Sequence, residues 1–214
     1  MADNGAIYTV GAFTAPGRYF ARFAADGTPD AAFNQNVGAA LNGPANSIWI
    51  DEHSGAITVG GEFTTPSAHL ARFHADGTPD TAFNEAIGDA FDGAIYGIAE
   101  DVNGGLVVAG MFTTPTDSAM KLSQDGTLDE EFAEAVRGQM PVAYFVDVTP
   151  ETGELTFAQS QNPPLYRMSA DGAPDTAFNA AVQATGIRTA WEFYRDPDTK
   201  AWPSRWTSTR TPVR

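Results

Sequence analysis

The sequence predicts an all-β fold in which four tandem repeats of about 49 residues form consecutive blades of a small propeller. The first observation is a nine-residue segment, Asp-Gly-Thr-Pro-Asp-Thr-Ala-Phe-Asn at 76–84, which recurs at 26–34 and 171–179 and, altered, at 125–133. Its copies start 50, 49 and 46 residues apart, and a period in this range indicates a repeat architecture. The second observation is that each repeat holds three short runs of β-branched and aromatic residues, which is typical of a propeller blade.

The first strand of each repeat is an apolar run that suits a half-buried pleated surface. These runs are residues 7–10, 57–59, 106–109 and 155–158. In the first three repeats a Phe-Thr-x-Pro segment follows, and we expect its proline to end the ladder because proline cannot donate a backbone hydrogen bond. The fourth repeat has lost this motif and reads Gln161-Asn162-Pro163-Pro164.

The second strand of each repeat carries one basic residue between apolar ones. These strands are expected at 19–23, 69–73, 119–122 and 165–168, with Arg22, Arg72, Lys121 and Arg167 at the shared position. The two-residue period places that charge on the face opposite the apolar pair. We expect each basic residue to pair with an aspartate of the adjacent turn or to pack its stem on aromatic rings. A row of cations lining a central channel and binding an anion is the alternative.

The third strand links one repeat to the next. It is expected at 47–50, 94–98, 143–146 and 190–194, and the first three are each followed by a turn and the next repeat's first strand. Asn103-Gly104 between apolar runs is a strong hairpin signal. The third strand of one repeat and the first strand of the next should therefore form a β-hairpin.

These elements predict one domain, residues 1–199, with repeats at about 7–56, 57–105, 106–154 and 155–199, followed by a tail at 200–214. Two arrangements of the ends are open. Residues 190–194 can pair with 7–10 and seal a four-bladed ring, which abolishes exposed strand edges. Alternatively the ring stays open, and the tail or a neighbouring subunit covers the edge. We expect the closed or nearly closed ring.

The nine-residue segment forms the corner of each repeat, and its pairs of aspartates suggest either a calcium site or a turn. Calcium requires six to eight oxygen ligands, and this spacing matches no EF-hand loop. The structural interpretation is that Asp-Gly forms a turn, Thr78 caps a helix with Pro79 at its first position, and Asp80 lies in its first turn. In the third repeat, Thr127 and Glu130 have the spacing of a capping box. The phenylalanine then enters the core. We therefore expect no metal or other cofactor and assign a structural role to Asp26, Asp30, Phe33, Asp76, Asp80, Phe83, Asp125, Asp129, Phe132, Asp171, Asp175 and Phe178.

Charge separates the body of the chain from its tail. The net charge is −15; all 27 acidic residues precede Lys200, whereas 200–214 holds four basic residues and no acid. An acidic body repels nucleic acid and anionic membranes, so neither is an expected partner. The chain has no cysteine, which excludes disulfides and thiolate catalysis. Tryptophan and arginine are favoured at interfaces, so the candidate partner-binding residues are those of the tail: Trp202, Arg205, Trp206, Arg210 and Arg214.

Catalytic signals are weak. His53, His69 and His74 fall in one repeat, and His53 stands beside Asp51 and Glu52 as a possible dyad. The sequence has no nucleophile elbow, HExxH motif or P-loop. Acidic residues are frequent enough that a glycosidase-like pair can arise, but the sequence does not locate one. Aromatic residues of the third strands can form a sugar-stacking surface or simply pack the strands: Trp49, Tyr96, Tyr144, Phe145, Trp191 and Phe193.

The corner segment, preceded by Leu-Ala-Arg-Phe at 70–73 and Val-Gly-Gly-x-Phe-Thr at 59–64, resembles the delta-60 repeat of bacterial surface and phage structural proteins. The resemblance covers most of residues 7–199 and implies a β-propeller-like fold with no activity attached to the repeat. It implies a non-enzymatic structural or interaction module. The expected protein is an accessory component of the tail or capsid surface of a tailed phage, and its expected location is the virion. Its partners would be other structural proteins of the assembly or further copies of itself. The alternatives are a bacterial extracellular, cell-surface module that binds a glycan or surface polymer and, more weakly, a propeller hydrolase.

Overall fold

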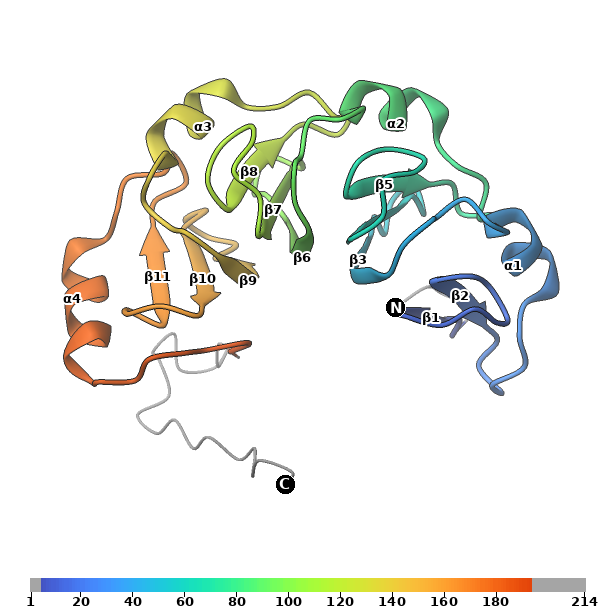
Figure 1. Cartoon of the computed structure of the whole chain (residues 1–214), viewed down its shortest axis with the longest axis horizontal. Coiled ribbons are helices and arrows are strands. Elements are labelled where there is room, and N and C mark those ends of the chain that lie inside the picture. The colour runs from blue at the N-terminus through green and yellow to red at the C-terminus, as the bar shows by residue number, and fades with distance from the viewer. Residues whose placement is uncertain (1–4, 194–214) are drawn as a thin grey trace.

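A computed structural model of the chain describes residues 5–193. Four small antiparallel sheets follow one another along an open arc, and one short helix per repeat lies on the outer rim (Figure 1). The first sheet contains β1 (Ile7–Val10) and β2 (Phe20–Phe23). The second contains β3 (Ala45–Ile50), β4 (Ile57–Gly61) and β5 (Leu70–Phe73). The third contains β6 (Ile95–Glu100), β7 (Leu106–Gly110) and β8 (Ala119–Leu122). The fourth contains β9 (Ala143–Val148), β10 (Leu155–Gln159) and β11 (Leu165–Met168).

The sheets confirm the predicted hairpins between repeats. β3 pairs with β4, β6 with β7 and β9 with β10, so each three-stranded sheet takes one strand from one repeat and two from the next. The three shared strands, β3, β6 and β9, lie on the inner side of the arc (Figure 1). Each three-stranded sheet therefore contains residues of two successive repeats.

The helices are α1 (Ala31–Val37), α2 (Thr81–Ile87), α3 (Glu130–Val136) and α4 (Thr176–Ala184). They are shorter than an isolated helix needs to be stable in water, so their stability comes from packing. α1, α2 and α3 each bury a phenylalanine and an aliphatic residue one turn later. No helix in the described part of the chain is both long and apolar enough to cross a membrane.

The core is divided among the junctions between successive sheets. Between the first and second sheets, Phe20 and Phe33 pack edge-to-face at 5.2 Å, and Phe73 lies 5.4 Å from Phe20. The second junction is centred on Phe83, Phe91 and Phe112. Because three of the apolar clusters each span two successive sheets, neighbouring sheets stabilise one another along the arc.

The expected ring is not closed within residues 5–193. β1 pairs with β2 alone, and the first and fourth sheets lie at opposite ends of the arc (Figure 1). The described residues 190–193, expected to pair with β1, form no strand and pack beside the fourth sheet, where the Ala190 N–H donates to the Gln159 carbonyl at 3.0 Å. The angle between successive sheets is set by the packing at each junction. At this angle, four sheets do not complete a ring.

Candidate functional site

The corner of the second repeat shows what the recurring polar residues do. The Asp80 carboxylate accepts the Phe83 N–H at 3.2 Å and so caps α2, while its other oxygen accepts from Arg72 Nε at 2.8 Å. The Arg72 guanidinium lies 4.1 Å from the centre of the Phe83 ring, close enough for a cation–π interaction. One carboxylate thus caps the helix and holds the cation against the phenylalanine.

The first and fourth repeats build the same corner. Arg22 pairs with Asp30 at 2.7 Å and Arg167 with Asp175 at 2.5 Å. Each guanidinium lies over the corner phenylalanine, at 4.4 Å from Phe33 and 4.3 Å from Phe178. Arg22, Arg72 and Arg167 are therefore members of separate corners, each held by the aspartate of its own repeat, and do not form a row that lines a channel.

The third repeat departs from this pattern. Lys121 pairs with Asp101 at 2.8 Å, and both side chains are about nine-tenths buried. Asp101 lies in the turn before β7, whereas Asp129 caps α3 through the Phe132 N–H at 3.0 Å. Lysine ends in a single ammonium group in place of the arginine fork, and here this group reaches the turn aspartate and not the cap.

Helix capping differs from the sequence prediction by two residues. We expected Thr78 as the N-cap, but its hydroxyl donates to Asp76, and Pro79 bridges to Phe73 in extended backbone. The cap is Asp80, whose N–H donates to the Arg72 carbonyl and prolongs the strand ladder. The capping box expected at Thr127 is likewise absent, because α3 begins at Glu130 after Asp129. Aspartate and threonine are both good caps, and pairing of the preceding proline with the strand decides between them.

The first aspartate of each corner segment closes a tight turn. Asp76 accepts from the backbone N–H and hydroxyl of Thr78, at 2.9 and 2.6 Å, and these bonds lower the pKa of Asp76. At Asp125 the bond from the Ser123 hydroxyl and two from Thr127 lower the pKa to about 2. Both carboxylates are therefore ionised at neutral pH, so neither can serve there as a general acid.

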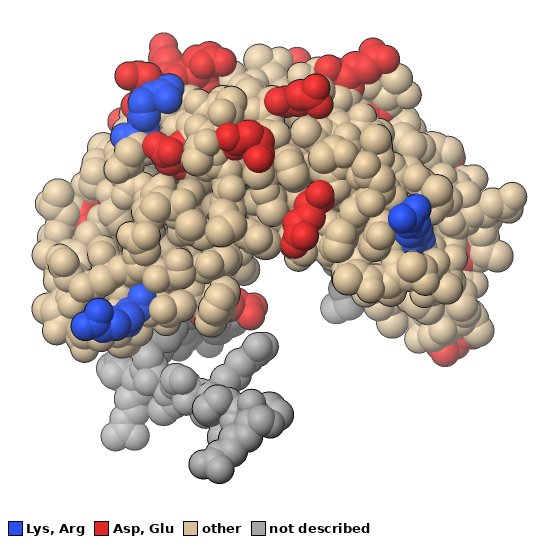
Figure 2. All heavy atoms as spheres, viewed as in Figure 1, with Lys and Arg blue, Asp and Glu red and all other residues tan. Residues whose placement is uncertain are grey.

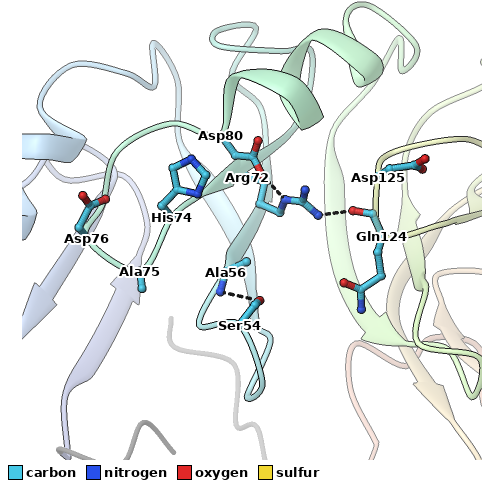
Figure 3. A pocket seen from close by; sticks show the side chains of 9 residues that line it. All are labelled: Ser54, Ala56, Arg72, His74, Ala75, Asp76, Asp80, Gln124 and Asp125. Carbon is cyan, nitrogen blue, oxygen red and sulfur yellow. Dashed lines mark hydrogen bonds and ion pairs between the residues drawn. The ribbon is translucent and has the colours of Figure 1, made fainter.

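A cleft of about 700 Å³ opens beside this corner, between the second and third repeats (Figure 3). Its lining includes Arg72, His74, Asp76, Asp80 and Asp125. Figure 3 shows Arg72 reaching across it to the backbone of Gln124, while Asp80 holds the same guanidinium from the other side. In the described residues no group of three or more histidine, aspartate or glutamate side chains is placed to hold a metal ion. The cleft is an open seam between repeats that is bridged by one arginine.

The histidines are dispersed. His53 is almost fully exposed, with its ring nitrogen 3.6 Å from Asp51, and Asp51 is engaged by the Ser54 hydroxyl and the His53 N–H. His69 bonds the Gly61 carbonyl at 3.1 Å through its ring. His74 lines the cleft. The pair of His53 and Asp51 therefore belongs to an exposed turn.

An aromatic row runs across the inner strands. The rings of Tyr96 and Tyr144 lie 5.5 Å apart, and Trp191 lies 4.6 Å from Tyr144. Trp191 is 64% exposed, whereas both tyrosines are partly buried. Burial, followed by the negative charge of Glu62, raises the pKa of Tyr96, so its hydroxyl stays protonated and can donate a hydrogen bond.

The other third-strand aromatic residues do not join this row. Trp49 packs against the second junction's core, and Phe145 meets Phe193 edge-to-face at 5.2 Å beside the fourth sheet. The sequence identified these residue types but not which of them meet, because the contacts cross from one repeat to the next.

The last residue of the corner segment binds the corner arginine, a role that was not predicted from the sequence. Asn34, Asn84 and Asn179 each accept from the N–H of the corner arginine and donate to its carbonyl, at 2.7–3.1 Å. Recurrence of asparagine in three of four copies is the signal that could have shown it. The five candidate partner-binding residues of the tail lie outside the described residues.

The sequence profile of one family, described as a domain of unknown function (DUF5122) beta-propeller, matches residues 3–33 and 54–83. The chain is similar to a repeat-type β-propeller. The matched segments run from the first strand to the corner phenylalanine of the first two repeats, and the four successive sheets agree with this likeness. No match among curated proteins was found.

Proposed function

We propose that this protein is a non-enzymatic structural and interaction module, an accessory component of the tail or capsid surface of a tailed phage. The observation that carries the proposal is that the charged side chains of the corners form ion pairs with one another. Asp30, Asp80 and Asp175 each cap a helix and neutralise an arginine, so the most regular polar groups of the chain are used in its own fold. The placement in a virion is supported by the resemblance of the corner segment to delta-60 repeats.

The surface available to partners is acidic and aromatic. Acidic side chains gather along the outer rim in the view of Figure 2, while Tyr96 and Tyr144 lie on the inner strands β6 and β9, with Trp191 stacked against Tyr144. An acidic rim favours contact with basic protein surfaces and disfavours nucleic acid. We expect the partners to be other proteins of the assembly.

Fractionation tests this proposal directly. Antibodies against the purified chain should label intact particles from an induced lysate and detect the protein in density-purified particles. Detection only in cell-wall or secreted fractions would contradict it and favour the bacterial surface alternative.

Deletion of residues 201–214 tests the tail: incorporation into particles should fall, and unchanged incorporation would exclude an anchoring role for the tail.

The aromatic row supports a second candidate, a glycan-binding module. Stacked, exposed rings bind the apolar faces of sugars, and Trp191 offers the most open ring of the row. Substitution Trp191→Ala or Tyr144→Ala should abolish binding on a glycan array, whereas Val102→Ala, at a similarly exposed turn residue, should leave it unchanged. Equal signals from all three variants would contradict a site in this row.

A further inference from the structure

The two ends of the arc expose the two surfaces that bind each other at every internal junction. The leading face of the first sheet carries Ile7, which is 52% exposed, with Phe13 and Phe23 partly exposed. Their counterparts in the second sheet, which are fully buried against the sheet before them, are Ile57, Phe63 and Phe73. The same apolar set is thus covered at an internal junction and open at the first sheet.

The trailing face of the fourth sheet is the complementary half. The corner phenylalanines of the first three repeats, Phe33, Phe83 and Phe132, are at most 3% exposed, because the next repeat covers them. α4 has no fully buried residue, and its Phe178 and Val182 are both partly exposed. Both faces leave apolar side chains exposed to water. The stabilisation that their burial would contribute is therefore lost at each end.

One contact identifies the fit at atomic detail. A Cβ built on Gly77 would lie within 3.0 Å of the Phe33 ring of the preceding repeat, and one on Gly126 within 3.4 Å of the Phe83 ring. Gly172 likewise faces Val136 and Phe132. At Gly27, the matching glycine of the first repeat, there is no heavy atom within 4 Å. The surface at Gly27 that would contact the phenylalanine of a preceding repeat is therefore present and exposed.

Backbone groups repeat the same arrangement. Arg22 Nη1 donates to the Ala75 carbonyl at 2.9 Å, and Arg72 Nη1 donates to the Gln124 carbonyl, in each case reaching the following repeat's turn. Across the two ends, the corresponding pair would be the Arg167 guanidinium and the backbone carbonyl of Ala25, which lies in an exposed turn. The first sheet also has two strands where the others have three, so one edge of β1 is unpaired within the described residues.

We propose that two copies of this chain join head-to-tail at both ends and close an eight-sheet ring. The trailing face of each copy seats Phe178 against Gly27 of the other, which brings residues 190–193, packed beside the fourth sheet, next to the open edge of β1 of that other copy. The two seams are equivalent under a two-fold axis, so the assembly is closed and finite. Eight blades lie within the range that propellers adopt, and closure removes the exposed strand edge.

Engineered cysteines test the seam, because the natural chain contains none. A Cβ on Gly126 would lie 3.3 Å from the Ala86 Cβ, and one on Gly172 would lie 3.1 Å from the Ala135 Cβ. The matching pair across the ends is Gly27→Cys with Ala181→Cys. Under oxidation this double variant should give a covalent dimer on non-reducing gels, and mixing the two single variants should give a link between two chains.

The control is Ala86→Cys with Gly126→Cys, which should close within one chain. It carries the same backbone strain, because Gly27 and Gly126 both have positive φ, 83° and 94°. If the control closes and the seam pair gives only unlinked chains, the proposal is overturned. Linked species larger than two chains would also overturn closure by two copies.

The mass in solution provides an independent readout. By light scattering the full chain should have twice its 22.7 kDa mass, and Ile7→Glu or Phe178→Glu should return it to the single-chain value with an unchanged circular dichroism spectrum. Met111→Glu is the matched control, because Met111 is equally exposed (51%) and the second repeat already has Glu62 at that position. A natural chain that stays at 22.7 kDa would overturn the proposal and leave residues 194–214 or another protein to cover these faces.

Discussion

Asn84 bonds both backbone groups of Arg72: its Oδ1 accepts the Arg72 N–H at 2.7 Å, and its Nδ2 donates to the Arg72 carbonyl at 3.0 Å. Asn84 is 4% exposed, so these bonds join α2 to β5 in a buried setting. The helix and the strand are thereby held in one register. The same asparagine performs this task in three repeats, whereas Ala133 stands at the position in the third.

Substitution Asn84→Ala should lower the free energy of unfolding by about 1–3 kcal/mol, because the partly buried Arg72 N–H loses its acceptor. Chemical denaturation followed by circular dichroism measures this loss. Glu85→Ala, at the exposed neighbour on the same helix, should change stability by less than about 0.5 kcal/mol. Equal effects from the two variants would show that the bonds to Arg72 contribute nothing.

Substitution Phe83→Ala should cost ~3–5 kcal/mol, because it empties a site at the centre of the second junction and removes the ring beneath Arg72. Phe83→Leu keeps most of the apolar volume and should cost clearly less. Thermal and urea unfolding of both variants provide the comparison. A loss below about 1 kcal/mol for the alanine variant would contradict the role of Phe83 as a core residue.

Substitution Lys121→Met should destabilise the fold by ~3–5 kcal/mol, because Asp101 then keeps a nearly buried charge without its cation. Burial raises the pKa of Asp101, but the Lys121 bond and charge outweigh it, so the pKa lies below its usual value. The double variant Lys121→Met with Asp101→Asn should recover most of the loss. A double variant no more stable than the single one would exclude this explanation.

Asp92 makes stability sensitive to acid. Bonds from the Thr113 hydroxyl and from the N–H groups of Thr113 and Thr114 lower its pKa to about 2, although partial burial opposes them. A depressed pKa in the folded state contributes stability above the unfolded value near ~3.9, and this contribution is lost as pH falls through about 2. Asp92→Asn copies the first repeat, where Asn42 accepts from Thr64, and should reduce the acid loss between pH 4 and 2 in thermal melts. Unchanged pH dependence would show that Asp92 does not contribute to it.

Chelation should leave the protein unchanged. The corner aspartates are engaged by hydroxyls, backbone N–H groups and arginines, and in the described residues no cluster of acidic and histidine side chains is placed to hold a metal. Melting temperatures in EDTA and in millimolar calcium should agree within error. A rise of several degrees with calcium would identify a cation site at the corners.

Local sequence was enough to predict the strands and the hairpins that join repeats. The runs at β1, β8 and β11 match in full, because strand composition and turn residues act over a few positions. The start of α2 was misplaced, because Thr78 and Asp80 are both suitable caps and only the Phe73–Pro79 bridge selects one. Local patterns decide such elements except where two residues compete for the same role.

The curvature of the arc and the aromatic row could not be predicted from sequence. Curvature depends on how Phe20, Phe33 and Phe73 interlock at a junction, and a small change in each angle decides whether four sheets close. The row of Tyr96, Tyr144 and Trp191 joins residues about 47 positions apart, so its members become neighbours only when the arc forms. Both features depend on contacts between repeats, which residue types do not specify.

Each three-stranded sheet takes β3, β6 or β9 from the repeat before it, and this has a consequence for how the chain unfolds. None of the first three repeats can open without breaking the sheet of the repeat that follows. In the single chain, amide hydrogen exchange should therefore report nearly uniform protection through the second, third and fourth sheets, with faster exchange in two-stranded β1 and β2. Although its contacts are only between neighbours, the array should lose its structure as one cooperative unit, beginning at the N-terminal end.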